Sequence, residues 1–122
     1  MRHATPVAGA FLAVAFADGR YDGREETRFL TRVANHPALG CVRTAALAEA
    51  YNTLREEIEQ DFAATAARIL DAIAAVRAEP AVSEAVLVAA RSAIVADHVL
   101  SAQEEIILSR IAAALGLEEG LV

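Results

Sequence analysis

Residues 96–108 read ADHVLSAQEEIIL, and residues 17–29 read ADGRYDGREETRF. Both stretches place an Ala-Asp pair after an apolar run, follow it with a short connector, and then carry a Glu-Glu pair before the next apolar residues. A shift of 79 positions superposes Asp18 on Asp97. Internal repetition bears on the assignment of every other element, so it is considered first. The chain contains the same helical hairpin twice.

The repeat predicts the architecture. Its halves, at about 6–35 and 82–117, are each a pair of helices joined by an acidic turn. Between them, apolar residues recur at helical spacing over 47–58 and 62–76. Residues 1–122 are therefore predicted to form a single all-α domain. We expect a compact bundle of about six helices, built from two pseudo-repeated hairpins that flank a middle helical pair.

Several helix ends can be predicted from local chemistry. Thr5 and Pro6 are suited to open the first helix, with a hydroxyl cap and a proline at the first helical position. Asp61 is placed to cap the fourth helix, and Gly116 to end the last helix in the left-handed region. The run 86–95 is apolar on almost every side, which predicts a central position in the bundle.

The composition limits the kinds of partner. The chain is 56% hydrophobic and carries thirty alanines, which combine high helix propensity with little bulk. Its formal charge is −6, and all 11 basic residues are arginines scattered along the chain. Nucleic-acid surfaces normally show a basic patch, so we expect no DNA or RNA partner. An acidic surface suits cations or basic protein patches.

The N-terminal apolar run allows two locations. Residues 7–17 end in Ala-Phe-Ala and have the outline of a secretory signal cleaved near Ala17. The same run is the repeat partner of 86–96, so its removal would take the first helix from one hairpin. We therefore predict a cytoplasmic protein, with export after cleavage as the alternative. The run is too short to span a membrane, which needs about 20 apolar residues.

The sequence shows little sign of catalysis. Cys41 is the single cysteine, which excludes an internal disulfide, and it is interpreted as an idle or buried thiol. The histidines His3, His36 and His98 lie in the tail or beside predicted helix ends, without a recognisable triad sequence. A metal-dependent hydrolase would normally bring more ligands than the chain offers. We predict that the protein is not an enzyme.

The two acidic turns hold the candidate metal ligands. The first turn carries Asp18, Asp22 and Glu25, and the second carries Asp97 and Glu104. Hard divalent cations prefer such carboxylate oxygens, although the spacing is not that of an EF-hand. Helix capping competes with this interpretation, because an opening helix directs N–H groups at carboxylates without a metal. Capping explains Asp18 and Asp97 least well, since an aspartate at a helix C-terminus opposes the dipole. Spacing alone leaves both interpretations open.

Three motifs resemble the tellurite-resistance TerB family and its TerB-like relatives. They are Ala-Asp-Gly-Arg-Tyr-Asp-x-x-Glu at 17–25, Ala-Asp-His-Val-Leu-Ser-x-x-Glu at 96–104 and Ala-Ala-Ala-Leu-Gly-Leu at 112–117. The similarity extends over nearly the whole chain, including the middle segment around 51–62. The resemblance implies a compact helical bundle without catalytic activity, which acts in bacterial responses to tellurite and other stresses.

The resemblance also implies a binding role. Members of the family are thought to bind divalent cations through such acidic clusters and to associate with other Ter-system proteins, including a membrane component. The positions that match the family motif are Asp18, Gly19, Asp22, Glu25, Asp97, Ser101 and Glu104. His98 replaces the glycine of the motif, and it is either an added nitrogen ligand or an exposed loop residue.

The leading hypothesis is a non-enzymatic stress-response module that binds Ca²⁺, Mn²⁺ or Zn²⁺ and associates with partner proteins. The alternative is a metal-free helical domain that docks another protein or a second copy of itself. The two hypotheses differ in whether divalent cations stabilise the fold.

Overall fold

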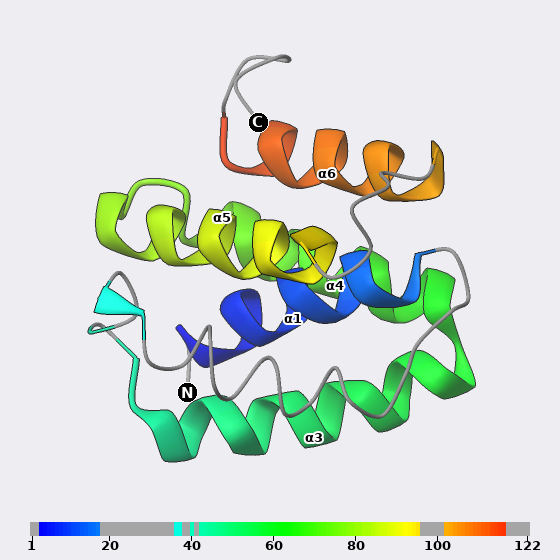
Figure 1. Ribbon diagram of the computed structural model, residues 1–122, viewed down its shortest axis with the longest axis horizontal. Helices are drawn as coiled ribbons and strands as arrows, with labels where there is room; N and C mark the ends of the chain where they lie inside the picture. Colours follow the sequence, from blue (N-terminus) through cyan, green and yellow to red (C-terminus); the bar gives the residue numbers. More distant parts are fainter. Residues whose placement is uncertain (1–2, 18–35, 38–39, 41, 96–101, 117–122) are drawn as a thin grey trace.

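The computed structural model describes residues 3–17, 36–37, 40, 42–95 and 102–116 (Figure 1). Within these ranges there is no β-strand, which confirms the predicted all-α class. The described helices are α1 (Ala4–Phe16), α3 (Thr44–Gln60), α4 (Phe62–Ala75), α5 (Pro80–Val95) and α6 (Ala102–Ala114). The helix expected to end near residue 35 lies outside the described residues, as do the connectors of both repeat halves. The six-helix count and the pseudo-repeat therefore stay predictions.

Helix α1 is the centre of the bundle. It contacts α3, α4, α5 and α6, and Figure 1 shows it between α3 on one side and α5 with α6 on the other. Its sequence, ATPVAGAFLAVAF, contains no charged side chain, so no face of the helix requires water. The buried residues are Ala4, Pro6, Val7, Ala8, Gly9, Ala10, Phe11, Leu12, Ala13 and Val14.

Two predictions for the apolar helices need correction. The central position predicted for the run 86–95 belongs to α1, because α5 exposes Glu84 and Arg91 to solvent. The predicted hydroxyl cap at Thr5 is also wrong, since α1 begins two residues earlier, at Ala4, and its N-cap His3 makes no side-chain cap hydrogen bond. Pro6 still falls in the first turn, where a backbone N–H has no partner within the helix.

The middle pair of helices follows the predicted pattern. The buried face of α3 consists of Leu47, Ala50, Tyr51, Leu54 and Ile58. The rings of Tyr51 and Phe11 lie 6.1 Å apart at 47°, a tilted aromatic contact between α3 and α1. Between α3 and α4, the extended backbone of Asp61 ends the first helix, and its Oδ1 accepts a hydrogen bond from the Ala64 N–H at 3.1 Å. The predicted cap is confirmed.

The last helix packs across the bundle. Helix α6 contacts α4 and α1 through a buried face that includes Ile107, Leu108 and Ile111. Gly116 follows it with a φ of 77°, which confirms the predicted left-handed stop. Among the described helices, none is long and apolar enough to cross a membrane.

We predict that Gly9→Ala destabilises the fold. A Cβ at Gly9 would lie 2.7 Å from Cγ2 and 2.8 Å from Cγ1 of Ile69, which is fully buried on α4 and stiff because it is β-branched. Overpacking of this kind costs about 1–3 kcal/mol, against at most about 1 kcal/mol gained in helix propensity. Urea denaturation of a double-mutant cycle with Ile69→Ala checks the cause. In the Ile69→Ala background, Gly9→Ala should leave the free energy of unfolding unchanged or raise it. An equal decrease of that free energy in both backgrounds would contradict the close contact.

Removal of the α4 cap should have a smaller effect. Asp61→Ala removes the acceptor of the Ala64 N–H, and losing such a cap lowers the free energy of unfolding by about 1 kcal/mol. Asp61→Ser keeps an oxygen at the cap and should retain most of the stability. Chemical denaturation of the three proteins gives the comparison, and equal midpoints for the alanine and serine variants would show that the hydrogen bond is not what matters.

Candidate functional site

The structure describes one of the five proposed metal ligands. Glu104 lies in the first turn of α6. Asp18, Asp22, Glu25 and Asp97 fall outside the described residues, and so do Cys41 and His98. The structural account of the site therefore rests on Glu104 and on the helix ends that lead into the two turns.

Glu104 is buried although it is charged. Only 3% of its surface is exposed, and it shares the buried face of α6 with Leu108 and Ile111. A carboxylate removed from water is costly unless hydrogen bonds or opposite charges compensate, and that of Glu104 is not without a partner. The amide groups at the helix N-terminus also favour a negative charge there. Its neighbour Glu105 is exposed. Position 104 is therefore an internal acidic group beside a helix end.

The ends of α1 and α6 lie at the same end of the molecule. These two helices contact each other, and Figure 1 shows the C-terminal end of α1 and the N-terminal end of α6 on the same side of the view. The last turn of α1 closes with a hydrogen bond from the Ala17 N–H to the Val14 carbonyl at 3.2 Å. Ala17 directly precedes the first acidic turn in sequence, and α6 directly follows the second. One flank of each predicted turn is thus brought to a common end of the bundle.

Comparison with known proteins identifies the family. The family described as Tellurite resistance protein TerB matches residues 4–121. The chain belongs to the TerB family. Comparison of this chain with curated proteins and with solved structures found no match. The resemblance carried by the Ala-Asp motifs and the closing Ala-Ala-Ala-Leu-Gly-Leu segment is confirmed over almost the whole length of this TerB-family chain.

The described part of this TerB-family chain does not hold a complete three-ligand metal site by itself. Within the described residues, no three side chains of His, Cys, Asp or Glu gather in an arrangement that could hold a metal ion. A site with three such ligands therefore needs at least one residue from outside these ranges. Glu104 is the member of the predicted ligand set that the described part of the chain can supply.

The described N-terminal histidine has a different role. His3 Nε2 lies 3.1 Å from Glu79 Oε1, so the start of α1 is joined to the connector between α4 and α5. Both side chains are about one-third exposed, and an ion pair in such a position contributes little to stability. The contact is a weak surface link between the start of the central helix and that connector.

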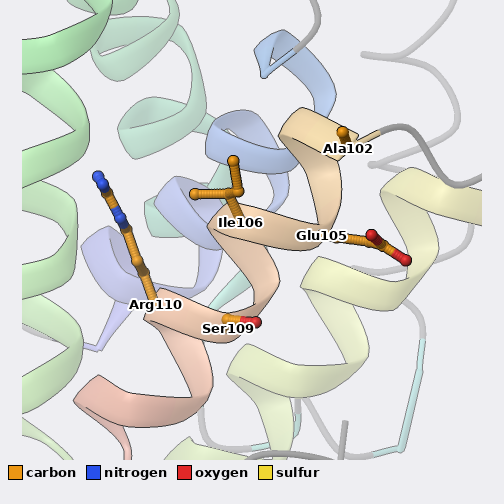
Figure 2. Close-up of a pocket in the computed structure, with 5 residues that line it drawn as sticks. All are labelled: Ala102, Glu105, Ile106, Ser109 and Arg110. Carbon is orange, nitrogen blue, oxygen red and sulfur yellow. The ribbon is translucent and has the colours of Figure 1, made fainter.

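A second surface feature of the TerB-family chain lies on the outside of α6. It is an open hollow of about 520 Å³, lined by Ala102, Glu105, Ile106, Ser109 and Arg110. Figure 2 shows the side chains of Glu105 and Arg110 leaving opposite sides of the helix, with Ile106 between them. Glu104 does not line this hollow. The two faces of α6 thus present different chemistry, with one carboxylate inside and an apolar residue outside.

The burial of Glu104 was missed at the sequence level. The acidic motif predicts it as a capping residue and a metal ligand, and neither prediction says whether its side chain is buried. The signal is the helical period, because positions 104, 108, 111 and 115 share one face and the last three are buried and apolar.

Proposed function

We propose that this TerB-family protein is a non-enzymatic module of tellurite and stress resistance that binds a divalent cation between its two acidic turns. The ligands are Asp18, Asp22 and Glu25 from the first turn and Asp97 and Glu104 from the second. The observation that carries the proposal is the burial of Glu104 in the first turn of α6, at the end of the bundle where α1 finishes.

The helix ends supply an electrostatic reason for a cation. The C-terminus of a helix carries partial negative charge and favours a positive group nearby. Helix α1 has no basic residue in its last turn, and Asp18 lies two residues beyond its last residue, Phe16. Several carboxylates at one end of a bundle also repel each other. A divalent ion offsets both effects, which plain capping at the helix N-termini does not.

The ligand set favours particular ions. Oxygen ligands alone suit Ca²⁺ or Mn²⁺, whereas Zn²⁺ prefers nitrogen or sulfur ligands. Zinc binding would therefore require His98 in addition to the carboxylates. We expect Ca²⁺ and Mn²⁺ to bind without it.

We further propose that the protein acts in the cytoplasm and associates with other Ter-system proteins, among them a membrane component. The net charge of −6 supports docking against a basic protein surface. The packing of α1 supports the cytoplasmic location over export, because cleavage near Ala17 would remove the helix that all four other described helices contact.

We predict that millimolar Ca²⁺ or Mn²⁺ raises the melting temperature. A ligand that binds only the folded state stabilises it by about 2.7 kcal/mol at 100 times its dissociation constant. For a chain of this size, with an unfolding entropy of about 2.1 cal/mol/K per residue, that corresponds to a shift of about 10 °C. Asp18→Asn combined with Asp97→Asn should remove the gain, and it should not lower the metal-free melting temperature, because it relieves repulsion between carboxylates.

Two adjacent glutamates provide a matched control. Glu104→Gln should reduce the metal-induced gain, because it removes a buried ligand. Glu105→Gln removes an equal charge one residue away on the exposed side and should leave the gain intact. Differential scanning calorimetry with and without metal gives the comparison. If no divalent ion shifts the wild type, the cation proposal fails and the metal-free interaction domain is the better account.

A further inference from the structure

The outer face of α6 has the pattern of a helix-pairing seam. Ala102, Ile106, Ser109 and Ala113 are all exposed and follow one another at spacings of four, three and four residues. They lie opposite the buried face of the helix. Ile106 is 53% exposed and is the exposed large hydrophobic residue of the described chain. The other three side chains are small, so a second helix could approach this stripe closely.

Opposite charges flank the stripe. Glu105 lies on one side and Arg110 on the other, as Figure 2 shows. Among the interactions of the described residues, neither of these two side chains takes part in an ion pair. The two residues are five positions apart. In two parallel, in-register helices, a residue on one flank of the seam lies beside the residue five positions later on the partner helix. Ion pairs at these flanking positions determine which helices pair and in which orientation.

We propose that this face binds a second copy of the chain, with the two α6 helices parallel about a two-fold axis. Ile106 then packs against the partner's Ile106, and β-branched residues at this seam position favour two-stranded pairs. Glu105 meets the partner's Arg110, and by symmetry the pair forms twice. In an antiparallel arrangement, Glu105 would lie on the same side as the partner's Glu105, and Arg110 on the same side as the partner's Arg110. Like charges would then repel each other. The charges therefore select the parallel arrangement.

The size of the seam sets the expected affinity. A 13-residue helix is about 20 Å long, and one such helix per subunit buries less than the roughly 1,200 Å² of a stable interface. We therefore expect weak association, with a dissociation constant on the order of 100 µM. The proposal does not depend on the cation site, since the seam and Glu104 lie on opposite faces of α6.

Sedimentation equilibrium of the full chain from about 10 µM to about 1 mM tests the proposal in the range where a weak dimer forms. Ile106→Glu should weaken association at least tenfold, whereas Thr53→Glu, which adds the same charge at an exposed position on α3, should not change it. Arg110→Glu should weaken it as well, and the exchange Glu105→Arg with Arg110→Glu should restore it. A wild type that stays monomeric, or a dimer insensitive to Ile106→Glu, would overturn the proposal.

Crosslinking tests the orientation. Ala102→Cys in a Cys41→Ser background leaves one thiol per chain, and parallel helices bring the two thiols together across the axis. In an antiparallel pair with Ala102 beside the partner's Ala113, the two positions would be about 16 Å apart along the helix. Efficient disulfide formation at concentrations where the protein associates supports the parallel seam. Failure to crosslink under those conditions overturns it.

Discussion

The burial of α1 on all sides is the constraint on which the rest of the structure depends. A charge-free helix with ten buried residues must be enclosed by other helices, and α3, α4, α5 and α6 all contact it. The enclosure requires small side chains where helices approach closely, as at Gly9, where an added Cβ would lie 2.7 Å from Ile69 Cγ2. Alanine-rich helices make this approach possible with few large aromatic residues, because side-chain bulk would hold the helix axes apart.

The same constraint determines where the acidic turns begin. Because α6 packs on α1 and α4, its first turn lies at the end of the bundle where α1 finishes, and the buried face of α6 carries Glu104 there. The opposite face of the helix is left to solvent with Ile106, Glu105 and Arg110. One helix thus presents a buried acidic residue, proposed as a cation ligand, and an exposed stripe, proposed as a helix-pairing seam.

Local patterns in the sequence predicted much of the fold. The all-α class, the apolar face of α3, the Asp61 cap and the Gly116 stop all depend on neighbouring residues, and the structure confirms them. What depends on three-dimensional enclosure was harder to predict. The runs 7–17 and 86–95 are both apolar, and hydrophobic periodicity does not reveal which of them is surrounded by more helices. The acidic motif predicts a capping or metal-binding carboxylate at Glu104, whereas its burial follows from its position on the apolar face of α6.

The central claim is that both acidic turns contribute to one cation site. The most direct measurement is NMR of the isotope-labelled full chain during addition of substoichiometric Mn²⁺, whose unpaired electrons broaden nearby signals. The account predicts simultaneous broadening of the amide signals of 17–25 and 97–104, while those of the exposed Glu49 and Glu56 on α3 stay sharp. Broadening of one turn alone, or of acidic residues over the whole surface, would contradict a shared site.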